Sequence, residues 1–478
     1  MFEQLISQHW FSLHSLLVAV GLLIYGVTTH ARKQRRHPAV ALTWVVSLAF
    51  LPYLALPIYL LIGDRKSVSA QAPECRVAAP AMGLASTTLA ERFRQLSVAM
   101  GLPPAATYEG LAIHEDGREA LEALRAVMNQ ASRTLDVSTF LLGRDVLGAE
   151  VSAILMQRAQ AGVQVRLLID GIGVYMGGIP ALGPLRRAGV VVELFVSPLR
   201  SVLPGRTNLR NHRKMAVADG QTVWMGGRNL ASEYFVGDPK SHPPQPPWVD
   251  LTFVCSGALA AQAQSQFDQD WHFSKTGLLI AASTSKPTPK STPLGAAVEP
   301  RAVAQFLPSG PDQADDTLYA LLISSCFSAQ RRITIVTPYF VPDATLLMAL
   351  TLAARRGVAV DVVLPAKSNH RLADIARHAS LRDMADAGAL IWLCPGMVHA
   401  KAVLIDEDLA LVGSANVDER SLFLNYEMMV AFFAPSDVQR FSQWVARQRA
   451  GAKHYVARQP GMAYTFAEGI VLWLAFQL

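Results

Sequence analysis

The stretch that decides the fold reads His212-Arg-Lys-Met-Ala-Val-Ala-Asp219, and it recurs as His399-Ala-Lys-Ala-Val-Leu-Ile-Asp406. Each copy is followed by glycine and then asparagine, in Gly226-Gly-Arg-Asn229 and Gly413-Ser-Ala-Asn416. The step between matched positions, from 212 to 399 and from 229 to 416, is always 187 residues. One H-x-K-x4-D pattern is expected by accident about 0.01 times in such a chain. A doubled set in a fixed register therefore predicts an internal duplication.

The segments around each copy repeat as well. In each, a helical stretch ends near a glycine and gives way to a short apolar β-branched run, which is typical of a buried strand in an α/β layer. We therefore predict an α/β fold with two duplicated domains, at 106–281 and 301–460, joined by a Ser/Thr/Pro-rich linker at 282–300. The matched helices are 151–160 and 346–355, and the matched strands are 134–140 with 333–340 and 161–170 with 356–365.

The composition is apolar for a chain of 478 residues. Only 17% of the residues are charged and the mean hydropathy is +0.25, whereas soluble domains carry roughly 25% charged residues. This excludes a disordered chain and argues against a wholly soluble enzyme. The net charge of +6 fits nucleic acid, an anionic membrane surface or an anionic substrate equally well. The four cysteines lack the spacing of a zinc site or of a disulfide framework.

Much of the apolar content lies at the N-terminus. The runs 10–28 and 39–63 are long enough to approach the width of a bilayer, and 30–37 between them carries four basic residues. We expect a transmembrane hairpin over 1–64, followed by a linker at 65–105. Pro52 and Pro57 indicate that the second run is bent or re-entrant. The positive-inside rule places the basic loop 30–37 in the cytoplasm. If both apolar runs cross the membrane, the catalytic body then lies on the outer face. If the second run is re-entrant, the body lies on the opposite side.

The C-terminal segment 461–478 is also apolar. Glu468 is the only charged residue from 463 onward. Because the apolar run is short for a membrane span, we expect an interfacial or packed terminal helix.

The paired motifs carry the residues that phosphodiester chemistry needs. Two copies packed about a pseudo-twofold axis bring two histidines, two lysines and two asparagines into one cleft, because residues two apart in a strand share a face. One histidine can attack phosphorus while the other protonates the leaving oxygen. The lysines and amides stabilise the developing charge without a metal or cofactor. The predicted catalytic residues are His212, Lys214, Asp219, His399, Lys401 and Asp406, supported by Asn229 and Asn416.

Four acidic residues complete the candidate site. Asp250 and Glu427 are expected to hold the second ring nitrogen of the histidines, which fixes the tautomer. A Pro-rich insertion at 238–247 makes the distance from motif to acid longer in the first copy. Asp219 and Asp406 belong to the catalytic motif, but their place at the far end of the strand favours a structural or salt-bridging role.

These motifs resemble the phospholipase D superfamily, whose mark is the doubled H-x-K-x4-D with a trailing G-[GS]-x-N. Within it, the chain is most similar to the bacterial cardiolipin synthases, whose pattern includes a membrane hairpin followed by two domains. The further segments that match are Arg36-His-Pro38, Trp44, Tyr59-Leu-Leu-Ile-Gly63, Ser309-Gly-Pro-Asp312, Thr337-Pro-Tyr-Phe-Val-Pro342 and Arg420-Ser-Leu-Phe-Leu-Asn-Tyr-Glu427. The first copy departs from the pattern of this family, because it has Gly226-Gly227 at a position where Gly-Ser is common among the members.

The resemblance implies a phosphatidyltransferase of the bacterial inner membrane, a multi-pass protein. It would move a phosphatidyl group from one phosphatidylglycerol to another through a phosphatidyl-histidine and release glycerol. By analogy His212 is the nucleophile and His399 the general acid, although some relatives reverse this. The partners expected are phosphatidylglycerol, other membrane phospholipids and the membrane, and no nucleic acid. The alternatives are a hydrolytic phospholipase D, a nuclease of the same superfamily, and a membrane scaffold with an inactive fold.

Overall fold

The structure of the chain is a computed structural model. It describes residues 2–31, 38–63, 88–196, 208–238, 244–277, 302–313, 315–458 and, with gaps at 463, 466–467 and 470, residues 460–471. The basic loop of the hairpin, most of the linker 65–105, part of the Pro-rich insertion and the whole linker 282–300 lie outside these residues.

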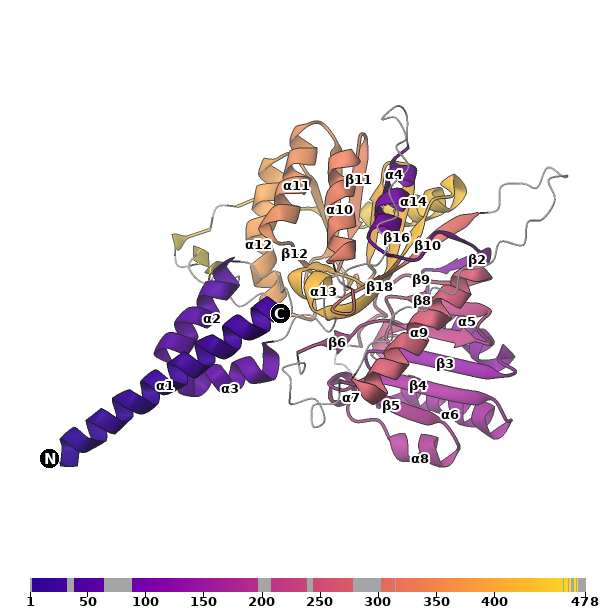
Figure 1. The fold of residues 1–478 in the computed structure, drawn as a ribbon. Helices are drawn as coiled ribbons and strands as arrows, with labels where there is room; N and C mark the ends of the chain where they lie inside the picture. The colour runs from indigo at the N-terminus through magenta and orange to yellow at the C-terminus, as the bar shows by residue number, and fades with distance from the viewer. Residues whose placement is uncertain are drawn as a thin grey trace.

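The first half of the chain forms a mixed sheet with the strand order β2-β9-β8-β7-β3-β4-β5. Strands β3, β4 and β5 are parallel, and the others pair antiparallel. Helices α5 and α6 cover one face and the long helix α9 covers the other (Figure 1). The elements are β2 (Glu109–His114), α5 (Gly117–Gln130), β3 (Thr134–Thr139), α6 (Val146–Gln160), β4 (Gln164–Asp170), α7 (Gly173–Met176), α8 (Leu182–Arg187), β5 (Val191–Phe195), β6 (Arg210–Asn211), β7 (Met215–Ala218), β8 (Thr222–Gly226), the 3-10 helix η1 (Ser232–Tyr234), β9 (Thr252–Ser256) and α9 (Ala258–Thr276).

The second half repeats this plan with the order β1-β10-β18-β16-β15-β11-β13-β14-β19. Helices α10 and α11 pack on one face and α14 on the other. The elements are β10 (Val303–Ser309), α10 (Thr317–Ser328), β11 (Arg332–Val336), β12 (Phe340–Val341), α11 (Ala344–Arg355), β13 (Ala359–Pro365), α12 (Arg371–Asp386), β14 (Leu390–Cys394), β15 (Ala402–Ile405), β16 (Leu409–Gly413), β17 (Val417–Asp418), α13 (Glu419–Phe423), β18 (Asn425–Phe432), α14 (Pro435–Ala450) and β19 (Lys453–His454). The predicted duplication of a mixed α/β unit is confirmed.

The two halves share one hydrophobic core. The rings of Phe253 and Phe432 lie 5.2 Å apart and those of Phe195 and Tyr426 lie 4.8 Å apart, each pair joining one half to the other. Strand β6 of the first half runs parallel to β18 of the second, with Arg210 opposite Asn425. The halves are therefore joined by buried apolar contacts and by backbone hydrogen bonds.

Part of the segment expected to be a linker, 65–105, is an ordered helix. Helix α4 (Leu89–Ala99) places Leu89 and Phe93 in the core of the second half. The next strand, β1 (Ala106–Thr107), pairs with β10 rather than with a strand of the first sheet. Helix α4 and strand β1 thus precede the first half in sequence but belong to the second half in space.

The N-terminal residues form the helices α1 (Phe2–Ala31), α2 (Pro38–Phe50) and α3 (Pro52–Ile62). The second apolar run bends at Leu51, directly before Pro52, while Pro57 lies inside α3. Thr28 and Tyr59 join α1 to α3 through their hydroxyl oxygens, which are 2.6 Å apart. Within the described ranges, no helix has both the length and the apolarity of a membrane-crossing segment.

The C-terminal segment packs against α12. Both carboxylate oxygens of Glu468 accept hydrogen bonds from Arg382, at 3.0 and 2.5 Å, and Glu468 is buried. Tyr464 lies 3.0 Å from His378 of the same helix. An ion pair therefore compensates the one charge in the otherwise apolar run.

Candidate active site

Both motifs begin just before a strand rather than inside it. Met215 and Ala402 are the first residues of β7 and β15, so the histidines and lysines lie in the extended segments that lead into these strands. Their backbones pair with the other half instead: His212 N donates to Tyr426 O at 2.8 Å and His399 N donates to Val249 O at 2.7 Å. The interface between halves therefore fixes the position of both histidines.

His399 is held by an acid of the first half. Its Nδ1 lies 2.6 Å from Oδ2 of Asp250, which is fully buried. Oδ1 of Asp250 accepts the Leu251 N–H at 2.7 Å, so the carboxylate has a fixed orientation. The rings of Tyr234 and Trp248 pack on His399 with centroids 5.0 and 5.6 Å away. With Nδ1 protonated toward Asp250, Nε2 of a neutral His399 is left with a lone pair.

His212 is held by an acid of the second half. Its Nδ1 lies 3.3 Å from Oε1 of Glu427, which is fully buried. Ser414 donates to Oε2 of Glu427 at 2.6 Å, and Asn425 donates to Oε1 at 3.3 Å. The ring of Phe140 packs edge-on against His212, with centroids 4.4 Å apart. The histidine partners are thus exchanged between the halves.

Each lysine folds back onto the histidine that precedes it. Lys214 Nζ donates to His212 O at 2.6 Å, and Lys401 Nζ donates to His399 O. Lys401 Nζ also lies 3.0 Å from Nε2 of His399. Both lysines are almost fully buried. Two ammonium groups close to the imidazoles create a positive field suited to a phosphate anion.

Burial and these charges shift the titration of the whole cluster. Burial, with the charge of the adjacent lysine, lowers the pKa of His212 to about 4 and that of His399 to about 3. Burial also lowers the pKa of Lys214 to about 8 and that of Lys401 to about 7. Burial alone would raise the pKa of Asp250, but His399 and Lys401 hold it at about 2. Near neutral pH both imidazoles are therefore uncharged and the acid is ionised.

The two predicted asparagines are both buried, and the contacts of Asn229 place it next to His399. Asn229 Nδ2 donates to the hydroxyl of Tyr234 at 2.8 Å, which places the amide beside His399. Asn416 follows β16 and immediately precedes β17, which pairs with β12. Both amides are buried, and among the described residues the Oδ1 atoms of both have no hydrogen-bond partner. One polar end of each amide is therefore available to a bound molecule.

The departure at Gly226-Gly227 has a structural cause. Ser414, in the second copy, holds Glu427 through its hydroxyl. At Gly227, in the first copy, a Cβ would lie 2.2 Å from Oδ1 of Asp250. Because Asp250 already occupies that space, only glycine fits there.

Asp219 and Asp406 lie at the opposite ends of β7 and β15 from the histidines. Asp219 accepts the N–H groups of Ser132, Arg133 and Thr134 at 2.7 to 2.9 Å. Asp406 accepts those of residues 330–332 at 2.8 to 3.3 Å. Each caps the turn before β3 or β11. This corrects the prediction of both as catalytic residues and agrees with the structural role that their position in the motif favours.

Arg213 is a further residue beside the predicted site, and it lies outside the set of residues that both motifs share. Its fully buried guanidinium donates to Glu427 O at 2.9 Å, to Ser309 O at 3.1 Å and to Asp312 at 2.7 Å, and it pairs with Asp270. It therefore fastens the backbone of Glu427 in place. The segment Ser309-Gly-Pro-Asp312, which matches the family pattern, could have pointed to Arg213, because Ser309 and Asp312 bind its guanidinium. The repeat itself gave no such signal, since the second copy has Ala400 at the position of Arg213.

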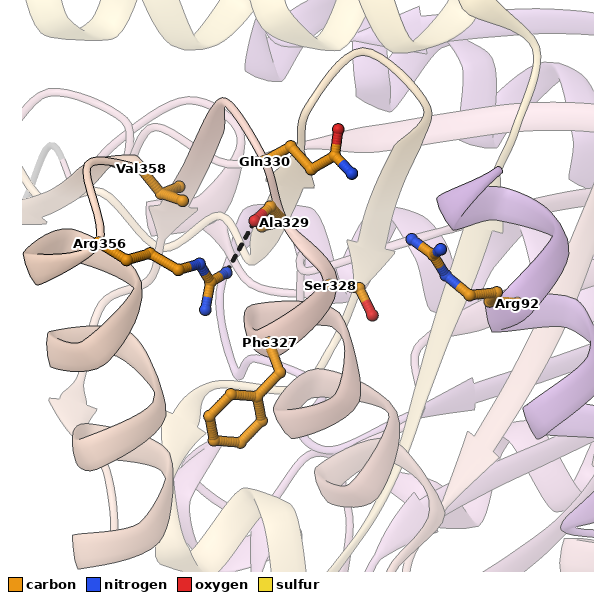
Figure 2. A pocket seen from close by; sticks show the side chains of 7 residues that line it. All are labelled: Arg92, Phe327, Ser328, Ala329, Gln330, Arg356 and Val358. Carbon is orange, nitrogen blue, oxygen red and sulfur yellow. Dashed lines mark hydrogen bonds between the residues drawn. The ribbon is translucent and has the colours of Figure 1, made fainter. Parts of the chain in front are cut away.

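A cavity of about 570 Å³ lies away from these residues, between α4, the end of α10 and the start of β13 (Figure 2). Arg356 points its guanidinium toward the carbonyl of Ala329, which accepts a hydrogen bond at 2.7 Å. Gln330 on its wall donates its N–H to Asp406, so the cavity lies at the end of β15 opposite His399. Among the described residues, no group of three or more His, Cys, Asp or Glu side chains is arranged to hold a metal ion.

Comparison with known proteins identifies this arrangement. The model of the cardiolipin synthase, phospholipase D-like domain matches residues 124–271 and 322–449, one match in each half. The chain belongs to this cardiolipin synthase family. The matched ranges contain both histidine–lysine motifs and both acids that hold the histidines.

Curated relatives in the cardiolipin synthase family match over most of their length. Cardiolipin synthase A of Pseudomonas aeruginosa (strain LESB58) is 33% identical over 434 residues, which cover 87% of this chain and 85% of that protein. The Pseudomonas syringae pv. syringae (strain B728a) protein of the same name is 31% identical over 428 residues, 86% of each chain. The solved structure of phosphatidylserine synthase from Haemophilus influenzae Rd KW20 has a TM-score of 0.59 at 14% identity and covers 82% of this chain and all of that one, which shows a shared fold.

Proposed function

We propose that this chain is a cardiolipin synthase, a phosphatidyltransferase that joins two phosphatidylglycerol molecules and releases glycerol. The observation that carries the proposal is the pair of neutral histidines, each held through Nδ1 by an acid of the opposite half. Membership of the family supplies the substrate class. His212, Lys214, His399 and Lys401 are the proposed catalytic residues, with Asn229, Asn416, Asp250 and Glu427 in support.

The proposed reaction has two displacements at phosphorus. In the first, Nε2 of one histidine attacks the phosphodiester, and the P–O bond to glycerol breaks as the other histidine donates a proton to the leaving oxygen. Both histidines are neutral in the free site, so the histidine that acts as general acid takes up one proton from solvent when the substrate anion binds. The lysines and one end of each amide then stabilise the equatorial oxygens, an effect commonly worth about 3 to 4 kcal/mol per donor.

In the second displacement, the terminal hydroxyl of another phosphatidylglycerol attacks the phosphatidyl-histidine. The now neutral second histidine takes the hydroxyl proton, the P–N bond breaks, and cardiolipin is released. By analogy with relatives we assign attack to His212 and acid–base work to His399. His212 is also the more accessible of the two, with 23% of its side chain exposed against 9% for His399.

We further propose that the N-terminal hairpin attaches the chain to the bacterial inner membrane as a multi-pass anchor. The support is the row of large apolar side chains that α1 to α3 leave exposed. They include Leu13, Leu16, Leu23, Val27, Leu42, Phe50, Leu51 and Leu54. Such a surface is stable in lipid and unfavourable in water. A lipid substrate explains an anchor of this kind better than a soluble nucleic acid does.

A hydrolytic phospholipase D is the competing function, since water could replace the second lipid. The test is to incubate the purified full chain with phosphatidylglycerol in detergent without added metal. We expect equimolar cardiolipin and glycerol. Phosphatidic acid as the main product would instead support hydrolysis. His212→Ala and His399→Ala should each abolish turnover while the protein stays folded, and activity retained in both would contradict the two-histidine mechanism.

A further inference from the structure

Four large apolar side chains stand exposed on the two connections that follow β3 and β4 in the first half. These connections, here called loops, include the first residue of α6 and the short helix α7. The exposed fractions are 79% for Val146, 55% for Tyr175, 66% for Met176 and 58% for Ile179. We call these four residues the apolar rim. Single exposed apolar residues are common on soluble proteins, but a group on adjoining loops indicates a contact surface.

The two loops of the apolar rim form one surface. Arg144 N donates to Gly177 O at 2.7 Å, which joins the loop after β3 to the loop after β4. A Cβ on Gly177 would lie 2.3 Å from Leu142 O, so the two backbones are in direct contact. Because β3 and β4 are parallel, both loops leave the sheet at its carboxyl edge.

The apolar rim borders the wall of the active site. The loop after β3 begins with Phe140, whose ring packs on His212. The loop after β4 begins with Asp170, which accepts the N–H groups of Ile172 and Gly173 through Oδ1 and that of Asn211, next to His212, through Oδ2. In Figure 1, α7 and β6 lie at the same end of the first sheet, on the side from which α1 to α3 project. A lipid with its phosphate at His212 therefore has its acyl chains close to the rim.

Ile179 has a backbone conformation that disfavours a large side chain. Its φ is +57°, a region in which a β-branched residue is a genuine outlier and glycine is not. The Ile179 N–H is nevertheless bound to Val174 O at 2.9 Å, so this turn is ordered. Folding would be served better by glycine, which indicates that the exposed isoleucine has another use.

The second half differs from the first at the connection that follows the strand equivalent to β3. Asp145 and Asp343 cap equivalent helices, α6 and α11, and the residue that follows the cap is Val146 in the first half but Ala344 in the second. Arg144, an exposed residue beside the apolar rim, has Pro342 in its place. A positive charge next to exposed apolar side chains complements an anionic lipid surface.

We propose that the apolar rim inserts into the headgroup boundary of an anionic phospholipid bilayer and so places the opening of the active site on the membrane, as a contact separate from the hairpin. The inference rests on the proposed function for the choice of lipid as the occupant. Amphipathic elements of this kind bury their apolar face roughly 5 to 10 Å into the headgroup and acyl boundary. The substrate can then reach His212 without leaving the bilayer completely.

The first experiment measures depth and does not depend on activity. The full chain carrying Met176→Trp is reconstituted in phosphatidylglycerol vesicles whose acyl chains are brominated, and its fluorescence is compared with that of the wild type. We expect at least half of the added fluorescence to be quenched. Val191→Trp is the matched control, since Val191 is 47% exposed at the amino end of β5, the opposite edge of the same sheet. Equal quenching at the two positions would overturn the proposal.

The second experiment uses Ile179→Gly, which removes the side chain and relieves the positive φ, so loss of folding is not expected. The readout is the ratio of the rate on phosphatidylglycerol vesicles to the rate on short-chain phosphatidylglycerol below its micelle concentration. We expect this ratio to fall at least fivefold for Ile179→Gly and to stay unchanged for Val191→Ser. An unchanged ratio in Ile179→Gly would reject the rim. A wild-type chain that makes no cardiolipin would reject the proposed function, and the quenching result would then decide on the rim alone.

Discussion

Nδ1 of His399 lies 2.6 Å from Oδ2 of Asp250, although one residue belongs to the second half of the chain and the other to the first. The reciprocal pair, His212 with Glu427, crosses in the opposite direction. Neither half therefore contains a complete histidine–acid pair. Duplication of the domain has produced one shared site rather than two independent ones.

Asp250→Asn should lower kcat by about three to four orders of magnitude, because an amide can donate to Nδ1 and so stabilise the wrong tautomer of His399. The measurement is glycerol release from phosphatidylglycerol, with thermal unfolding used to check the fold. Asp268→Asn, a matched change on an exposed residue of α9 that pairs with Arg166, should leave kcat near that of the wild type. Comparable rates in the two variants would show that Asp250 does not orient His399.

Gly227→Ala should also lower kcat, although it adds only one methyl group. The new Cβ would lie 2.2 Å from Oδ1 of Asp250, and that carboxylate is held by Leu251 N and His399, so the pair must move. We expect a loss of about 100-fold, in line with displacement of a catalytic group by about 1 Å. The assay is again glycerol release. Gly451→Ala is the control, because a Cβ there meets no atom within 4 Å.

The sequence alone predicted the duplicated fold and the residues of the candidate site, because both depend on a register that recurs along the chain. The pairing of each histidine with the acid of the opposite half could not be predicted, since it depends on how the two folded domains pack against each other. Arg213 was missed for a related reason. The position between His and Lys is arginine in the first copy and alanine in the second. Because the residue type is not repeated, the duplication does not mark this position as functional. Helix α4 could not be predicted within the linker 65–105, because its apolar face, with Leu89 and Phe93, is short and packs on a distant part of the chain.

Asp219→Ala should affect stability rather than chemistry. The carboxylate receives three backbone N–H groups, as a helix N-cap does, and loss of such a cap costs about 1 kcal/mol. Chemical denaturation should therefore show a lower midpoint, while kcat of the folded enzyme is kept. Asp406→Ala should behave in the same way, because Asp406 caps the equivalent turn. A large fall in kcat at full folding would place Asp219 in the catalytic machinery.

The stabilising effect of Asp219 should also depend on pH. Burial acts to raise its pKa, but the backbone donors outweigh this and lower the pKa to about 2. The unfolded aspartate titrates near its ordinary value of about 3.9. A group with a depressed pKa in the folded state stabilises the protein above the unfolded value, and the effect is lost as the pH falls toward 2. The denaturation midpoints of the wild type and Asp219→Ala should therefore differ at pH 6 and converge in acid.

The pH profile of kcat/KM should be displaced toward acid on both sides, because it reports groups of the free enzyme. Burial lowers the pKa values of His212 and His399 to about 4 and 3, so the neutral nucleophile persists well below the ordinary histidine value of about 6.5. On the alkaline side, the lowered pKa values of Lys401, about 7, and Lys214, about 8, predict that positive charge is lost from about pH 7 upward. Initial rates of glycerol release across the pH range measure both limbs.

The variant Lys401→Arg tests whether deprotonation of Lys401 causes the fall of kcat/KM at alkaline pH. A guanidinium stays protonated throughout this range, so the first part of the alkaline limb should move upward by at least one pH unit even if the maximal rate is lower. The shape of the profile, and not its height, is the readout, since arginine is longer and cannot reproduce the contact of Lys401 with His399 O. If the alkaline limb keeps its position in Lys401→Arg, a group other than Lys401 controls it.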